Sequence, residues 1–192
     1  MKKVLLIVVI ILLMFSNITF KKYNTEIEEV TTKIKNSSFN KNYAILIDYS
    51  LHSSFNRMHI VDLKTKKIIK SFKVLHGRGD SKYFSFKKEF SNQVGSNKSS
   101  IGFSVILFKS NSVWGNKYNY RLKGLSKTNS NIKNRNIVLH SWGGVSNIGL
   151  FPIPLPQSQG CPTVSNKALK YTDSLIQSQK NKNILIYSFN EK

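Results

Sequence analysis

The stretch from Ile137 to Val164, IVLHSWGGVSNIGLFPIPLPQSQGCPTV, contains the only cysteine of the chain, Cys161. Cys161 stands in a Gly-Cys-Pro sequence, and His140 ends a short apolar run. A thiol and an imidazole are the groups of a cysteine nucleophile and its base, and glycine and proline favour the loops that bring such groups together. This stretch therefore predicts a catalytic thiol at Cys161 with His140 as its base.

An alternative interpretation makes Cys161 a buried structural thiol, since free cysteines are among the most buried residues. The glycine- and proline-rich surroundings are unlike a core position and favour catalysis. No Asp or Glu lies near His140 or Cys161 in the sequence, so a backbone carbonyl such as that of Ser141, or an amide side chain, is expected to orient the imidazole. Backbone N–H groups of residues 159–161 would form an oxyanion hole. The run from Phe151 to Pro156 is either a wall over the site or a rigid connector.

Outward from this stretch, the apolar pattern predicts many short strands and two helices. The strands are expected over residues 43–49, 57–63, 68–75, 101–108, 118–122, 137–141 and 184–188. Helices are expected over 23–35, as a stalk or packed on the domain, and over 166–179, with Ser165 as N-cap. His59 occupies one of the alternating positions of its expected strand, and this position predicts a half-exposed surface residue. Many strands with few helices indicate a mainly β domain, a sandwich or open barrel.

The N-terminal segment differs from the rest of the chain. Residues 1–22 have a basic start, an unbroken apolar run from Val4 to Phe15 and two closing lysines. This pattern predicts an export signal or an uncleaved, helical membrane anchor, and the lack of a clean Ala-x-Ala site favours the anchor. The expected organisation is this segment, a helical stalk or linker over 23–42, and a catalytic domain over 43–192. The domain is expected to work outside the cytoplasmic membrane.

The chain is strongly basic, with 30 Lys and Arg against 9 Asp and Glu and a formal charge of +21. Such a charge favours anionic partners, such as nucleic acid, anionic lipid or an acidic cell-wall polymer. No Arg-rich run or aromatic–basic repeat indicates nucleic acid, which is not an expected partner. A composition rich in Lys and Asn along the whole chain explains the charge equally well.

The segments His140-Ser141 and Ser158-Gln159-Gly160-Cys161 together resemble the active-site motif of the bacterial L,D-transpeptidases, which have the YkuD-type fold. The closest likeness is to the murein L,D-transpeptidase catalytic domain family, and it covers about residues 43–187. Further similar blocks are His76-Gly77, Ser99 to Gly102 and Tyr120 to Leu125. The resemblance implies a mainly β, YkuD-like sandwich or open barrel with one or two helices.

The resemblance also implies a reaction and a set of roles. The Cys161 thiolate would attack the bond before the terminal D-alanine of a peptidoglycan tetrapeptide stem and pass the acyl group to an amine of a second stem. His140 would be the base, the Ser141 carbonyl would orient it, and the N–H groups of Gly160 and Cys161 would stabilise the oxyanion. The substrate-binding residues would be Arg121, which would hold a carboxylate, and His76, Gly77, Ser158 and Gln159. No metal or cofactor is expected.

Two departures from the commoner motif concern the substrate side. Gln159 stands where that motif has a histidine, and Pro162-Thr163-Val164 replaces an arginine that often follows the cysteine. If water replaces the amine, the enzyme is an L,D-carboxypeptidase. Other classes are a zinc hydrolase that uses ligands among His76, Asp80, His140 and Cys161, and a non-catalytic wall-binding domain. The expected partners are donor and acceptor peptidoglycan stems in the periplasm or cell envelope and, through an uncleaved N-terminal segment, the cytoplasmic membrane.

Overall fold

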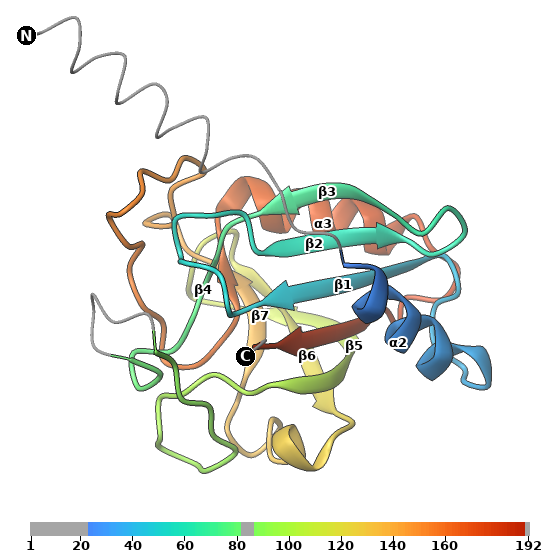
Figure 1. Cartoon of the computed structure of the whole chain (residues 1–192), viewed down its shortest axis with the longest axis horizontal. Helices are drawn as coiled ribbons and strands as arrows, with labels where there is room; N and C mark the ends of the chain where they lie inside the picture. The colour runs from blue at the N-terminus through green and yellow to red at the C-terminus, as the bar shows by residue number, and fades with distance from the viewer. Residues whose placement is uncertain (1–22, 82–86, 191–192) are drawn as a thin grey trace, which may run out of the picture.

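The computed structural model describes residues 23–81 and 87–190 (Figure 1). The export signal or anchor expected over residues 1–22 lies outside the described residues. Within the described part of the chain, no helix is both long enough and apolar enough to cross a membrane.

The described strands form one nine-stranded sheet. Across the sheet the order is β3 (Lys67–Phe72), β2 (Met58–Asp62), β1 (Tyr43–Asp48), β9 (Leu185–Phe189), β5 (Gly102–Asn111), β6 (Tyr118–Gly124), β7 (Val138–Ser141), β8 (Thr163–Val164) and β4 (Val74–Leu75). Although β3 and β4 stand at opposite ends of this order, only Lys73 separates them in the sequence. The sheet therefore curls until its two ends meet, and the molecule is a nearly closed barrel. The expected mainly β class is confirmed, and of the two expected architectures the barrel is the one observed.

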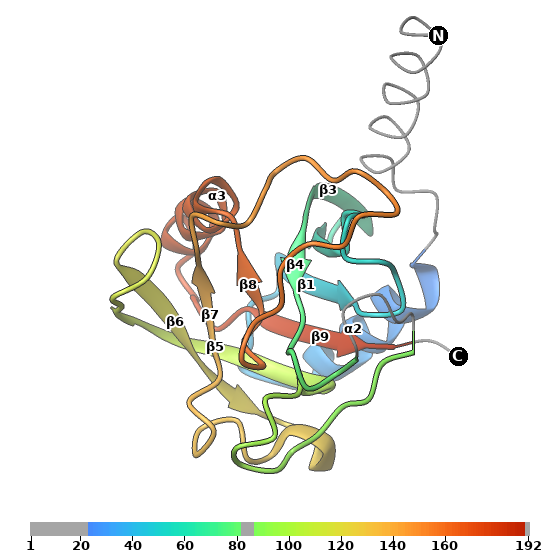
Figure 2. The same ribbon diagram turned by 90° about the vertical axis from the view of Figure 1, so that its left-hand side faces the viewer.

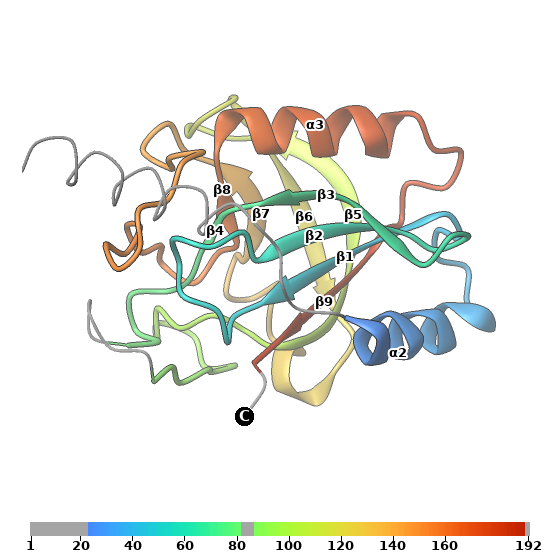
Figure 3. The same ribbon diagram turned by 45° about the horizontal axis from the view of Figure 1, so that its top comes forward.

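The strand β1 is buried on both faces because a helix covers each side of it. Its residues Ile45 and Ile47 pack in a cluster with α3 (Asn166–Gln177). The alternate residues Ala44 and Leu46 pack with α2 (Asn24–Lys35), as the two-residue period of a strand requires. Figure 3 shows the two helices on opposite sides of the sheet. Both predicted helices are confirmed.

The helix α2 packs on the sheet through the buried side chains of Ile27, Val30 and Ile34, and its N-cap residue Tyr23 is buried in the same cluster. The Tyr23 hydroxyl donates to the Asp48 carboxylate at 3.2 Å and lies 3.1 Å from Nε2 of His59. His59 is fully buried, so its predicted place on a half-exposed surface is wrong. The reason is that α2 covers this face of β2, which the alternation within the strand does not reveal.

The expected strand over residues 68–75 is divided at Lys73 into β3 and β4, and the two-residue strand β8 was not predicted. β8 lies between β4 and β7, and Figure 2 shows the three strands side by side. In the parallel pairing of β7 with β8, His140 stands opposite Thr163. This pairing brings the histidine strand beside the residues that follow Cys161, and it positions the site.

Candidate active site

A cavity of about 550 Å³ opens beside β6, β7 and β8, and Cys161 and His140 both line it. It is termed the Cys161 cavity, and its other lining residues are Leu75, Arg78, Ser112, Val113, Trp114, Asn119, Arg121, Asn136, Val138, Trp142, Gln157, Ser158, Gln159 and Thr163. Its volume is within the range of small-molecule sites, which is about 300–1,000 Å³. The structure therefore brings the predicted nucleophile and the predicted base into one cavity.

The thiol of Cys161 is held by backbone groups of the segment that leads into β7. Its Sγ accepts from the N–H of Val138 at 3.5 Å, and the thiol donates to the carbonyl of Asn136 at 3.8 Å. Burial raises the pKa of the Cys161 thiol above its ordinary value, and the Val138 N–H and the cations Arg135 and Arg121 oppose this only in part. The thiol is therefore protonated near neutral pH, and a base must remove its proton before it can act as a nucleophile.

The imidazole of His140 has the protonation pattern of a base. Its Nδ1 lies 3.1 Å from the carbonyl oxygen of Ser141. Because a carbonyl can only accept, Nδ1 carries the hydrogen and Nε2 keeps its lone pair. Burial lowers the pKa of His140, while the bond to Ser141 raises it, and the direction of the whole shift is downward. His140 is therefore neutral near pH 7, with Nε2 as its proton acceptor.

Thr163 is a contact of the base that sequence reasoning missed. Its Oγ1 lies 2.9 Å from Nε2 of His140 and 3.2 Å from the carbonyl oxygen of Cys161, and the residue is 2% exposed. One hydroxyl hydrogen cannot serve both acceptors at once. When His140 gains a proton, Nε2 becomes the donor, the Thr163 oxygen accepts, and the hydroxyl hydrogen turns to Cys161. Thr163 can thus pair with both protonation states of the base.

The cysteine loop, residues 157–162, depends on a glycine. Gly160 has a φ of +106°, and a Cβ on it would lie 2.7 Å from the carbonyl oxygen of Lys98. Its N–H donates to Oγ of Ser158 at 3.1 Å, while the Ser158 hydroxyl donates to the carbonyl of Cys161 at 2.8 Å. The N–H of Gly160 is therefore used within the loop. The N–H of Cys161 has no acceptor among the described residues, so it is the donor that can face an oxyanion.

His76 and Gly77, expected at the substrate site, are not among the described residues that line the Cys161 cavity. They lie behind the cysteine loop, where the N–H of Ser158 donates to the His76 carbonyl at 2.8 Å. A Cβ on Gly77 would lie 3.0 Å from the Cα of Gly160, so the two segments touch through glycines. Their contacts are those of a support for the loop that carries Cys161.

The side chain of His76 is held in a buried polar cluster. Its Nδ1 accepts from Arg57 at 2.9 Å, and burial together with the charge of Arg57 lowers the pKa of His76 to about 2. The neighbouring Asp80 carboxylate accepts from the N–H groups of Gly77 and Ser99 at 3.0 and 2.5 Å. Over the described residues, no group of three or more His, Cys, Asp or Glu side chains could hold a metal ion. Of the residues considered for zinc, His76 and Asp80 are hydrogen-bonded in this buried cluster, whereas His140 and Cys161 line the Cys161 cavity.

Arg121, Ser158 and Gln159, the other residues predicted to bind substrate, line the Cys161 cavity. One guanidinium nitrogen of Arg121 lies 3.4 Å from the side-chain oxygen of Asn136. Sequence reasoning did not select Arg78, which lines the same cavity and is exposed. Two guanidinium groups suit a ligand that carries carboxylates, because arginine pairs with carboxylate oxygens in a fixed geometry.

The proline-rich run from Phe151 to Pro156 is not among the described residues that line the cavity. Leu155 is buried in a small cluster with Leu75 and Val145, and its N–H donates to Oγ of Ser53 at 2.9 Å. Of the two interpretations of this run, these contacts favour the rigid connector.

The barrel, with its thiol and imidazole in one cavity, has the architecture of the L,D-transpeptidase class. The model of the YkuD_2 family, the L,D-transpeptidase catalytic domain, matches residues 15–188. The chain therefore belongs to the L,D-transpeptidase catalytic domain family, which was the family suggested by the motif around Cys161.

The comparison with solved structures finds matches at low sequence identity. A variant of the helical cell shape determining protein Pgp2 from Campylobacter jejuni is 10% identical with a TM-score of 0.51, over 86% of this chain and 55% of that one. An L,D-transpeptidase from Xylanimonas cellulosilytica is 12% identical with a TM-score of 0.44, over 80% of this chain and 63% of that one. The chain thus spans between 55% and 63% of the length of these structures. No curated protein sequence matches the chain.

Proposed function

We propose that this protein is a cysteine acyltransferase that acts on peptidoglycan stem peptides, an L,D-transpeptidase, with Cys161 as nucleophile and His140 as base. The observation that carries the proposal is the state of the base. The Ser141 carbonyl holds the proton on Nδ1 of His140, and Nε2 is left as the acceptor in the cavity that contains the thiol. Membership of the L,D-transpeptidase catalytic domain family supports the same reaction.

In the first half of the reaction, Nε2 of His140 takes the thiol proton and Sγ of Cys161 attacks the carbonyl before the terminal D-alanine. The N–H of Cys161 donates to the oxyanion. The imidazolium then protonates the leaving amine of D-alanine, and a thioester remains on Cys161. No hydrogen bond between Cys161 and His140 is present among the described contacts, and catalytic hydrogen bonds often tighten only with substrate bound.

In the second half, His140 removes a proton from an amine of a second stem, and the nitrogen attacks the thioester. The C–S bond breaks, and the thiolate recovers its proton from the imidazolium. The carboxylates of the donor stem would pair with Arg121 and Arg78, which both line the cavity. We further propose that the domain works in the cell envelope, with the segment over residues 1–22 as its export signal or anchor.

The proposal is tested by removing each reacting group. Cys161→Ala and His140→Ala are each expected to lower D-alanine release from a tetrapeptide stem by at least about 10³-fold, as loss of a nucleophile or base does in other acyl-transfer enzymes. His52→Ala is the matched control, because His52 is not among the described residues of the Cys161 cavity. Thermal unfolding of each variant checks that the fold survives.

Mass spectrometry of the wild-type protein with muropeptides provides the direct readout. An acyl adduct on Cys161 with loss of one D-alanine is expected, and full turnover by Cys161→Ala would rule the mechanism out. The same samples distinguish the acceptor. Cross-linked dimers indicate transfer to an amine, whereas tripeptide stems alone indicate the L,D-carboxypeptidase reaction. Peptidoglycan binding without any D-alanine release would favour the non-catalytic alternative, and inhibition by a chelator instead of a thiol reagent would favour the zinc hydrolase.

A further inference from the structure

Asn119 has a buried side-chain oxygen without a partner in the wall of the Cys161 cavity. Its Nδ2 donates to the carbonyl of Asn111 at 2.9 Å, which establishes which end of the amide is the nitrogen. Oδ1 is buried, and no donor among the described residues reaches it. Asn119 itself is 6% exposed and lines the cavity. Buried polar oxygens are nearly always paired in folded proteins, so this one indicates a donor that arrives with a ligand.

The position of Asn119 relates this oxygen to the base. In the antiparallel pairing of β6 with β7, Asn119 stands directly opposite His140. Side chains of such a pair project from the same face of the sheet, with Cβ atoms about 4.5–5.5 Å apart. A small group in the cavity can therefore contact Nε2 of His140 and, once the side chains that cover it shift, Oδ1 of Asn119. A nitrogen that gives one proton to His140 and still carries another N–H satisfies both acceptors.

The hairpin that carries Asn119 also presents unpaired apolar surface. Val113 and Trp114, at the turn between β5 and β6, line the Cys161 cavity and are 78% and 57% exposed. Exposed apolar side chains beside a site mark a surface that a ligand covers. The reaction steps given above use neither residue.

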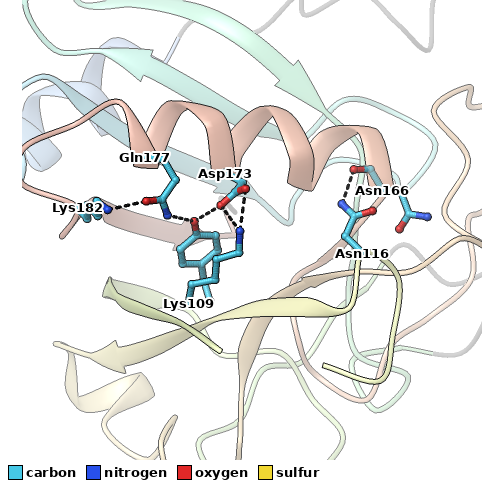
Figure 4. Close-up of polar contacts among 7 residues, drawn as sticks. Lys109, Asn116, Asn166, Asp173, Gln177 and Lys182 are labelled. Atoms are coloured by element: carbon cyan, nitrogen blue, oxygen red, sulfur yellow. Dashed lines mark hydrogen bonds and ion pairs between the residues drawn. The ribbon is translucent and has the colours of Figure 1, made fainter. Parts of the chain in front are cut away.

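Contacts hold this turn beside the histidine strand. The N–H of Asn116 donates to Oγ of Ser141 at 3.0 Å, and its side-chain amide donates to the Asn166 carbonyl at 2.8 Å (Figure 4). A Cβ on Gly115 would lie 2.2 Å from Oγ of Ser141, so glycine permits the close approach. Farther along the hairpin, Figure 4 shows the ion pair of Lys109 with Asp173 of α3, at 3.0 Å. These contacts hold the backbone of the turn beside the site, while the side chains of Val113 and Trp114 stay exposed.

We propose that the β5–β6 hairpin forms the acceptor subsite of the enzyme. Oδ1 of Asn119 holds one N–H of the acceptor amine while His140 removes another proton, and Val113 and Trp114 cover the carbon chain that bears the amine. The nitrogen then attacks the thioester carbonyl, the C–S bond breaks, and the imidazolium returns a proton to the sulfur of Cys161. This inference rests on the proposed function.

An amine fits this subsite better than water does. The Oδ1 atom is buried, so a donor reaches it only when the side chains around it shift. A stem peptide can drive that shift by covering the apolar surface of Val113 and Trp114, and a water molecule covers no such surface. The subsite therefore favours aminolysis of the acyl-enzyme over its hydrolysis.

The test measures the partition of the acyl-enzyme between an acceptor stem that carries a free amine and water. Asn119→Leu removes the acceptor oxygen with little change of volume, and the ratio of aminolysis to hydrolysis is expected to fall about tenfold, the effect of one hydrogen bond of ordinary strength. Asn119→Asp loses the bond to Asn111 but keeps the acceptor oxygens, and it is expected to retain most of the wild-type ratio. An unchanged ratio in Asn119→Leu, or an equal loss of ratio in both variants, would overturn the proposal.

A second measurement addresses the apolar part of the subsite. Trp114→Ala is expected to raise the KM for the acceptor stem about tenfold, because a large buried contact is lost. Phe108→Ala is the matched control, since Phe108 is 59% exposed on the same hairpin and is not among the described residues of the cavity. Equal acceptor KM values for Trp114→Ala and wild type would contradict the subsite. If the wild-type protein forms no acyl adduct at all, the proposed function fails instead.

Discussion

Thr163 is a residue of a common type whose hydroxyl contacts the imidazole of His140, the predicted base. Cysteine and histidine stand out in the sequence because the chain has one cysteine and four histidines. A threonine carries no such signal, and its contact with Nε2 of His140 exists only because β8 pairs with β7. The hydroxyl can donate to the neutral imidazole or accept from the imidazolium. The second bond is the stronger, because one of its partners is charged.

Removal of this hydroxyl is expected to slow the reaction and shift its pH dependence. Burial already lowers the pKa of His140, so the acidic limb of kcat/KM for the wild type lies below about pH 6.5, the ordinary value for histidine. In Thr163→Val the imidazolium loses an acceptor, which lowers the pKa of His140 further and moves the limb to still lower pH. The loss in kcat/KM is expected to be about 10- to 100-fold, the range for a hydrogen bond to a charged group.

Two control variants distinguish a loss of catalysis in Thr163→Val from a loss of stability. Thr163→Ser keeps the hydroxyl and is expected to restore both the rate and the pH profile. Thr172→Val removes another buried threonine hydroxyl, which donates to the Ala168 carbonyl at 2.9 Å within α3. For this variant, urea denaturation is expected to show a lower free energy of unfolding, and the pH profile of kcat/KM is expected to be unchanged. A wild-type profile and rate in Thr163→Val would show that the contact has no role in the reaction.

At the scale of the secondary-structure elements, the sequence pattern predicts those helices and strands that are determined by contacts between residues close in the sequence. The helices α2 and α3 and most of the strands follow from apolar spacing and from the N-cap at Ser165, whose Oγ accepts from the N–H of Ala168 at 3.1 Å. The strand β8 is too short to have a period, and pairing with its neighbours defines it. The burial of His59 likewise depends on α2, which precedes it by many residues.

The cysteine loop provides a prediction at the same scale. Gly160→Ala places a Cβ 2.7 Å from the Lys98 carbonyl oxygen at a φ of +106°. The free energy of unfolding is expected to fall by at least about 1–3 kcal/mol, the cost of one strained backbone position, and D-alanine release is expected to drop because the loop carries Cys161. Urea denaturation and the release assay measure the two effects.

Gly95→Ala is the matched control for Gly160→Ala. Gly95 also has a positive φ, +78°, but nothing lies within 4 Å of a Cβ placed there. Its substitution is expected to cost about 1 kcal/mol, the price of the left-handed conformation alone, with full activity. Normal D-alanine release by Gly160→Ala would contradict the role assigned to this glycine.

At the scale of the whole molecule, the sequence predicts a mainly β domain and proposes a set of site residues. The structure places five of them in one cavity, namely Cys161, His140, Arg121, Ser158 and Gln159. The sequence does not predict which neighbouring loop faces the cavity and which lies behind it. His76 and Gly77 are close to the cysteine loop in space, but they contact its rear side. Side-chain direction depends on the curl of the sheet, which arises from pairings between distant segments.

The net positive charge of the protein predicts salt-dependent binding to anionic polymers. At +21, the protein is expected to bind insoluble peptidoglycan that carries anionic polymer, and the bound fraction should fall steeply as salt rises from about 0.1 M to about 1 M. Over that range the screening length shrinks from about 10 Å to about 3 Å. A pelleting assay measures the fraction. Cys161→Ala should pellet like the wild type because its charge is the same, and binding that does not depend on salt would contradict an electrostatic origin.

The pairing of β1 with β9 sets the order in which the molecule can be completed. Residues 44–48 lie between β2 and residues 185–189 in the sheet, so one edge of the first strand has no partner until the last strand has been synthesised. Contacts between such distant segments form slowly, because a long loop must close first. The barrel therefore stays open until the residues of β9 are available to pair. A chain in that open state can still be threaded through a narrow membrane channel, which suits the export expected from residues 1–22.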